Sequence, residues 1–143
     1  MQNSLVKNQE RLSLGEEIAG IGIFELDIKT DTHYWSDQAY RLLGFEPQEF
    51  EGTTEKLISF IHPDDKERIA ERIERSFQLT EVENNEFKIV RKNGTARKVR
   101  TLSKTFFDSD GNAVSIVAIM QDITEMAETL ESLARSEDMY RTL

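Results

Sequence analysis

The last third of the chain narrows the choice of fold more than any other part. Two tight-turn signals, Asn93-Gly94 and residues 108–112, divide residues 84–121 into three strand-like segments. Strands joined by such short turns pair antiparallel. The segment at 113–121 is apolar at nearly every position, which is typical of a central strand covered on both faces. The sequence therefore predicts a three-stranded antiparallel meander here.

The N-terminal part of the sequence predicts a β-hairpin that must join the same sheet. Residues 23–29 alternate apolar and charged side chains, which indicates a half-buried strand, and residues 33–36 form a second short strand after a turn. A lone two-stranded hairpin is marginally stable, so both blocks of strands are expected in one sheet. The expected fold class is α+β, with a five-stranded antiparallel sheet.

Three short helices are expected between the two blocks, at 38–43, 55–61 and 65–78. Ser36 or Asp37 is suited to cap the first helix, and Asp64 the third. The third helix has one apolar stripe, made by Ile69, Ile73 and Phe77.

Composition excludes several classes of protein. There is no cysteine among the 143 residues, so disulfides, thiolate nucleophiles and Cys-based metal sites are ruled out. The net charge of −9 disfavours binding to nucleic acid. No apolar run is long enough to span a membrane, and the N-terminus lacks the apolar region of a signal peptide. We expect a cytoplasmic chain that does not itself contact a membrane, although a parent protein could be membrane-anchored.

Several short motifs, in this order and spacing, resemble the PAS domain with its C-terminal PAC motif. They are residues 19–27, Trp35-Ser36, residues 41–45, the His62-Pro63-Asp64-Asp65 loop, the Asn93-Gly94 turn, residues 108–111 and Asp122-Ile123-Thr124. The resemblance covers about residues 15–124. It implies an N-terminal flanking helix at 1–19, a PAS/PAC sensor domain at 20–124 and a C-terminal signalling helix at 125–143 that leads to a further module. The sequence departs from the family at two positions, with Lys98 in place of a frequent Trp and Ala118 in place of a frequent Gly, and both changes affect the packing expected for the sheet.

The resemblance also implies what lies between the sheet and its helices. In this family the helices cover one face of the sheet, and the space beneath them holds haem, flavin, a small carboxylate or nothing. A covalent flavin adduct needs a cysteine, which is absent. Haem-binding members place a histidine on the long helix, here 65–78, which contains none, so haem through His33 or His62 is disfavoured. A noncovalent small ligand, including flavin, stays open.

Aromatic and hydroxyl side chains are the candidates for lining such a pocket, although aromatic residues also fill ordinary cores. The candidate set is Trp35, Tyr40, Phe45, Phe87, Thr101 and Ser103, with Phe60, Phe106, Phe107 and Arg97 as further members. A one-residue shift in strand register would exchange the inward-facing residues of strands 95–107 and 113–121.

Asp122 and Thr124 are the candidate signal-coupling residues, because they lie where the last strand becomes a helix. Thr124 is suited to cap that helix, and Asp122 to bind backbone or a basic side chain. Met126, Leu130 and Leu133 continue an apolar seam from Ile123. A homodimer through the flanking helices and the outer sheet face is expected.

Three functions follow, in order of preference. The first is a sensory module of a two-component histidine kinase or a diguanylate cyclase, coupled to an adjacent PAS or output domain. The second is a ligand-free adaptor for protein interaction. The third, remote from the others, is a small enzyme that uses His62, Asp64 and Asp65.

Overall fold

The computed structural model describes residue 11 and residues 14–142 of the chain. The elements are β1 (Ile21–Asp27), β2 (Thr32–Trp35), α2 (Asp37–Leu42), α3 (Thr54–Ser59), α4 (Pro63–Ser76), β3 (Glu83–Val90), β4 (Ala96–Phe107), β5 (Ala113–Asp122) and α5 (Thr124–Thr142). Residues 14–19 are also helical. Most of the N-terminal half of the flanking helix expected at 1–19 lies outside the described residues, as do residues 12–13.

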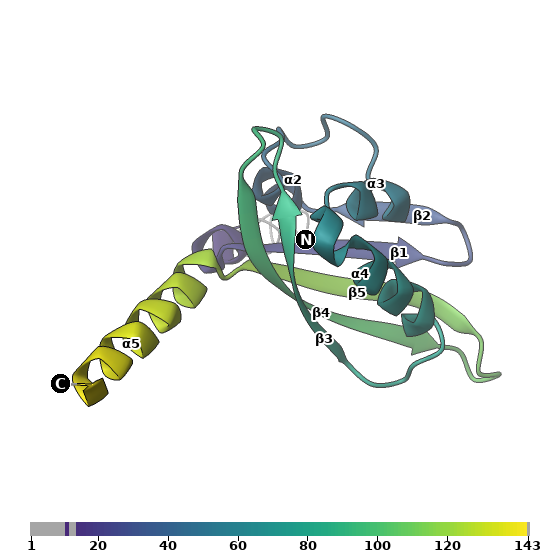
Figure 1. Ribbon diagram of the computed structural model, residues 1–143. Helices are drawn as coiled ribbons and strands as arrows, with labels where there is room; N and C mark the ends of the chain where they lie inside the picture. The colour runs from purple at the N-terminus through teal and green to yellow at the C-terminus, as the bar shows by residue number, and fades with distance from the viewer. Residues whose placement is uncertain (1–10, 12–13, 143) are drawn as a thin grey trace.

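The five strands form one antiparallel sheet in the order β2-β1-β5-β4-β3. The central strand, β5, pairs with β1 on one side and β4 on the other, so it joins the two blocks of strands. Helices α2, α3 and α4 lie on one face of the sheet, and α5 projects away from it (Figure 1). The expected α+β fold, a five-stranded antiparallel sheet with short helices on one face, is confirmed.

A single hydroxyl fixes the first hairpin to the first helix. Ser36 is the N-cap of α2, and its Oγ accepts hydrogen bonds from the backbone N–H of Ala39 (3.2 Å) and of Ile23 (3.0 Å). The same side chain thus satisfies a donor at the helix start and one on β1. Gly44 follows the helix at φ 88°, a conformation that favours glycine.

The start of α4 differs from the expectation. The helix begins at Pro63 and its N-cap is His62, whose Nδ1 accepts from the backbone N–H of Asp64 (3.1 Å); Asp64 is therefore not the cap. Proline favours the first helical position because it lacks an N–H, and the helix therefore starts two residues earlier than expected. Asp65 instead accepts from the N–H of Lys88 on β3 (2.8 Å), so this loop joins α4 to the sheet.

The two faces of the sheet differ sharply in burial. The inner face packs beneath the helices into the core, which contains Phe24, Trp35, Ala39, Tyr40, Leu43, Ile61, Ile69, Phe87, Ile89, Val99 and Met120. On the outer face, Ile119 of β5 pairs with Leu102 of β4, and each is 37% exposed. The expectation that β5 is covered on both faces is therefore wrong, because the described helices α2, α3 and α4 all pack on the opposite face.

Candidate functional site

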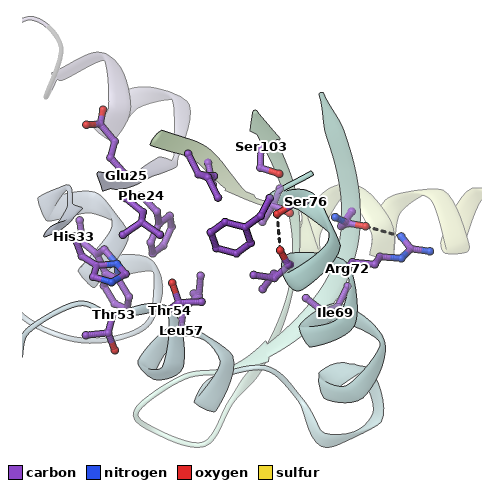
Figure 2. Close-up of a pocket in the computed structure, with 18 of the residues that line it drawn as sticks. Phe24, Glu25, His33, Thr53, Thr54, Leu57, Ile69, Arg72, Ser76 and Ser103 are labelled. Atoms are coloured by element: carbon purple, nitrogen blue, oxygen red, sulfur yellow. Dashed lines mark hydrogen bonds between the residues drawn. The ribbon is translucent and has the colours of Figure 1, made fainter. Parts of the chain in front are cut away.

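A small cavity lies between the inner face of the sheet and the helices α3 and α4 (Figure 2). It has a volume of about 100 Å³. Its walls are mainly apolar and include Phe24, Leu26, Trp35, Leu57, Ile69, Ile73, Phe77, Phe87, Ile116 and Ala118. Apolar walls with a few polar groups are typical of a small-molecule site.

The polar lining groups come from every wall of the cavity: Glu25, His33, Thr53, Thr54, Arg72, Ser76, Asn85, Thr101 and Ser103. Thr101 and Ser103 face the cavity from β4, and neither hydroxyl makes a side-chain hydrogen bond within the described part of the chain. Asn85 is paired with Thr101 across the two strands and is only 8% exposed. Arg72 reaches from α4 and its Nη1 donates to Asn85 Oδ1 (2.5 Å; Figure 2, dashed line at Arg72).

His33 lies on the inner side of β2, where it lines the cavity with its side chain 17% exposed. An imidazole here has the chemistry of an axial haem ligand. The space beside it does not fit haem or flavin, because drug-sized ligands already occupy pockets of roughly 300–1,000 Å³. The residues therefore favour a smaller molecule.

Four of the six expected lining residues line this cavity: Trp35, Phe87, Thr101 and Ser103. Tyr40 and Phe45 do not. They belong to an aromatic cluster around Phe50, with ring centroids 5.3 Å and 4.9 Å from that ring. The Tyr40 hydroxyl donates to the Phe50 carbonyl (2.9 Å), so its polar atom is used within the fold.

The four further candidates lie elsewhere. Phe60 packs against Phe45, Phe106 is 44% exposed, Phe107 ends β4 outside the cavity lining, and Arg97 lies at the end of the sheet where α5 begins. Sequence reasoning missed Phe24, Arg72 and Asn85 as lining residues. The position of Asn85 could have been predicted from the sequence, because it lies two residues before Phe87 and four before Ile89. This spacing places its polar side chain on the buried face of β3.

The second candidate site is the junction between β5 and α5. Asp122 Oδ2 accepts from Arg97 Nε (2.8 Å), while Asp122 Oδ1 accepts from the backbone N–H (2.9 Å) and the hydroxyl (2.6 Å) of Thr124. The Lys98 N–H donates to Thr124 Oγ1 (2.8 Å), and the Ile123 N–H donates to the Lys98 carbonyl (2.8 Å). The helix start is thus bonded to β4 at several points.

The capping role falls on a different residue from the one expected. Thr124 is the first helical residue, and its hydroxyl bonds back to Asp122 and across to β4 instead of capping later N–H groups. Asp122 accepts a hydrogen bond from the first N–H of α5, so this residue has the capping role that was expected of Thr124. Carboxylates are favourable at this end of a helix because of its dipole.

Electrostatics at the junction favour the charged pair. Partial burial alone would raise the pKa of Asp122, but hydrogen bonds from Arg97 and Thr124 outweigh it, so that pKa is lowered. The hydrogen bond to Asp122 raises the pKa of Arg97. Both side chains therefore stay ionised at neutral pH.

One strand connects the two sites. The inner face of β4 carries Arg97, Thr101 and Ser103, which are separated by even numbers of residues. The two hydroxyls that line the cavity therefore lie on the same face as Arg97, which binds Asp122. On β5, Met120 lies between Ala118, which lines the cavity, and Asp122. The residues between the cavity and the junction therefore belong to two directly paired strands.

The His62 loop does not have the geometry of a reactive centre. Its imidazole caps α4, and Asp65 accepts from Lys88. That backbone hydrogen bond is the main reason why the pKa of Asp65 is lowered. Within the described residues, no group of three or more His, Cys, Asp or Glu side chains could hold a metal ion. None of the described helices is long and apolar enough to cross a membrane.

Comparison with known families identifies the fold. The family described as "PAS fold" matches residues 32–120, which is more than half of the chain, so this chain belongs to the PAS-fold family. As a PAS domain it is a sensory module of signalling proteins and not an enzyme. The match ends before Asp122, and the PAC assignment of the junction stays a prediction.

Two curated relatives are signalling proteins. The chain is 26% identical over 129 residues to the probable diguanylate cyclase DgcE of Escherichia coli, and 27% identical over 124 residues to the sensor protein FixL of Bradyrhizobium diazoefficiens. These matches cover 90% and 87% of this chain, but only 12% and 24% of the relatives. The chain thus spans about a quarter or less of their length.

Solved structures show the same fold. A sensory box histidine kinase/response regulator from Burkholderia thailandensis superimposes with a TM-score of 0.71 at 23% identity, covering 93% of this chain and 99% of that one. The N-terminal domain of a diguanylate cyclase with PAS/PAC sensor from Marinobacter aquaeolei gives a TM-score of 0.67 at 17% identity, covering 75% and 98%. At these identities the likeness concerns the fold alone.

Proposed function

We propose that this PAS domain senses a small molecule in the inner cavity and relays its presence through Asp122, Ile123 and Thr124 to α5. The observation that carries the proposal is the shared inner face of β4. There the hydroxyls of Thr101 and Ser103, which make no side-chain hydrogen bond to another described residue, line the cavity, and Arg97 binds Asp122. A ligand that binds two states of the sheet differently would shift the balance between them.

The proposed output is a histidine kinase or a cyclic-dinucleotide enzyme that follows α5, directly or through another PAS domain. Relatives named as a diguanylate cyclase and a sensor protein support this choice. So does the shape of α5: from Glu128 to Met139 every described side chain is exposed, and the helix projects away from the body (Figure 1). The proposed location of the domain is the cytoplasm.

The relay is tested with Asp122→Ala and Thr124→Ala in a longer signalling protein that contains this chain. Each variant should leave the domain folded and change stimulus-dependent output several-fold, because the start of α5 loses its bonds to β4. Asp108→Ala is the matched control. Asp108 Oδ1 accepts from the N–H groups of Asp110 (3.0 Å) and Asn112 (2.9 Å) in the β4–β5 turn. Regulation that survives unchanged in both junction variants would remove the relay from consideration.

A second proposed function is self-association, which the adaptor hypothesis shares. The outer sheet face exposes Leu102, Phe106 and Ile119, and α5 exposes Met126 (55%), Leu130 (60%) and Leu133 (62%). Ile123 does not belong to this exposed seam, because it is 7% exposed in the body of the domain. We propose a homodimer in which α5 and the outer sheet face cover these side chains in a second copy.

We expect Leu130→Glu to weaken this dimer at least tenfold, because it places a charge in an apolar contact. Ser132→Glu, a change of the same charge at an exposed position of the same helix, is the control. Light scattering across a concentration series measures both. A wild-type chain that is monomeric at every concentration would contradict the dimer.

A further inference from the structure

The amide of Asn85 has a defined orientation. A guanidinium group only donates hydrogen bonds, so the amide atom that faces Arg72 Nη1 is the oxygen. The Nδ2 group of Asn85 therefore points away from Arg72, and it makes no hydrogen bond within the described residues. This side chain is 8% exposed and lines the cavity.

A hydroxyl lies next to this amide. Thr101 is directly paired with Asn85 across β3 and β4, and paired side chains on one face are roughly 5 Å apart. The Thr101 hydroxyl is also without a protein partner in the described part of the chain, and it lines the same cavity. Both donors are therefore available to an acceptor that enters the cavity.

The rest of the cavity sets the other properties of that acceptor. Phe24, Trp35 and Phe77 are among the mainly apolar lining residues, which suit a hydrocarbon body. Among the described lining residues, Arg72 is the one with a permanent positive charge, and its guanidinium is bonded to the oxygen of the Asn85 amide, on the side away from Nδ2. A charged head at Nδ2 would be buried without an opposite charge in contact, which is costly.

From these observations we infer that the cavity binds a small, uncharged molecule with an apolar body and one carbonyl-type oxygen, which accepts hydrogen bonds from Asn85 Nδ2 and the Thr101 hydroxyl. The volume of about 100 Å³ sets the size, since an apolar cavity of about 150 Å³ holds benzene. The ligand therefore has on the order of six non-hydrogen atoms. This inference rests on the proposed sensory role of the cavity.

Three probes of similar size test the inference. Cyclopentanone carries the carbonyl oxygen, methylenecyclopentane replaces that oxygen with a CH₂ group, and butyrate carries a charge. NMR titration of the 143-residue chain measures each dissociation constant, expected on the order of millimolar for such small compounds. Cyclopentanone should bind about five- to tenfold more tightly than methylenecyclopentane, because two donors gain an acceptor.

Two variants should abolish this preference. Thr101→Val removes the hydroxyl at nearly constant volume. Asn85→Asp keeps a partner for Arg72 but replaces the donor by an acceptor. Thr105→Val is the matched control on the same face of β4, because the Thr105 hydroxyl donates to the Ser76 carbonyl (2.8 Å) and is not part of the cavity lining. This control should retain the preference for the ketone.

Each outcome decides the inference. Equal binding of cyclopentanone and methylenecyclopentane, tighter binding of butyrate, or no binding of any probe to the wild-type chain at tens of millimolar would overturn it. The proposed relay through Asp122 would still stand after any of these results if Asp122→Ala changes the stimulus-dependent output. A ketone preference together with unchanged regulation in the Asp122 and Thr124 variants would instead overturn the relay alone.

Discussion

Gly22→Ala is expected to lower the free energy of unfolding by about 3 kcal/mol and the melting temperature by roughly 10 °C. Gly22 lies on β1 beneath α2. A Cβ at this position would be 2.6 Å from the Cα of Ala39 and 2.9 Å from its backbone nitrogen. These are backbone atoms of a fully buried residue, so no side-chain rotation relieves the clash. The strand and the helix would have to separate.

Gly15→Ala is the matched control for this prediction. Gly15 lies in the helical segment at 14–19, and a Cβ there would meet no atom within 4 Å. Alanine is a better helix former than glycine, so this change should be neutral or stabilising by up to about 1 kcal/mol. Thermal and urea unfolding measure both variants. Equal stability of Gly22→Ala and wild type would show that β1 and α2 are packed less closely than described.

Asp122→Asn is expected to reduce the free energy of unfolding by about 2 kcal/mol at pH 7, because the asparagine cannot form the charged pair with Arg97. The folded-state pKa of Asp122 lies below its ordinary value of 3.8. Its carboxylate therefore contributes stability that is fully present above that ordinary value and is lost as the pH falls through the lowered one. The difference between wild type and variant should shrink below about pH 4.

Urea unfolding at pH 7, 5 and 3 measures this dependence. A double-mutant cycle with Arg97→Gln isolates the contribution of the pair, since the two changes should be clearly non-additive at pH 7. Asp108→Asn, at the opposite end of β5, is the control for loss of a carboxylate elsewhere in the sheet. A difference between Asp122→Asn and wild type that is constant from pH 7 to pH 3 would contradict the assigned pKa shift.

Local sequence signals were enough to predict the elements but not all of their contacts. The alternation in β1 and the Asn93-Gly94 turn correctly indicated the strands, because side-chain period and turn chemistry are properties of neighbouring residues. Tyr40 was expected in the cavity and lies in the Phe50 cluster instead. That contact depends on the path of the loop after α2, which has no periodic pattern.

The central strand shows a second kind of limit. The apolar run of β5 predicts cover on both faces, yet Ile119 is exposed on the outer one. An apolar run indicates that the side chains of a strand are buried, but it does not show whether they are buried by the same chain or by another molecule.

Only part of the junction between β5 and α5 could be predicted from the sequence. Asp122 and Thr124 were identified from local spacing, whereas their bonds to Arg97 and Lys98 come from β4, some 25 residues away.

The hydrogen bonds between α5 and β4 involve Ile123 and Thr124 at the start of the helix, so in the proposed relay α5 acts as a lever. With 19 residues at about 1.5 Å each, it is roughly 28 Å long. A rotation of about 10° at Thr124 would therefore move its far end by roughly 5 Å, which is close to one helical turn. Sub-ångström adjustments of the hydrogen bonds at Asp122 are on the scale that such a rotation needs. In the proposed relay, a slight movement of β4 would thus become a large displacement of the C-terminal end of α5 without any change in strand register.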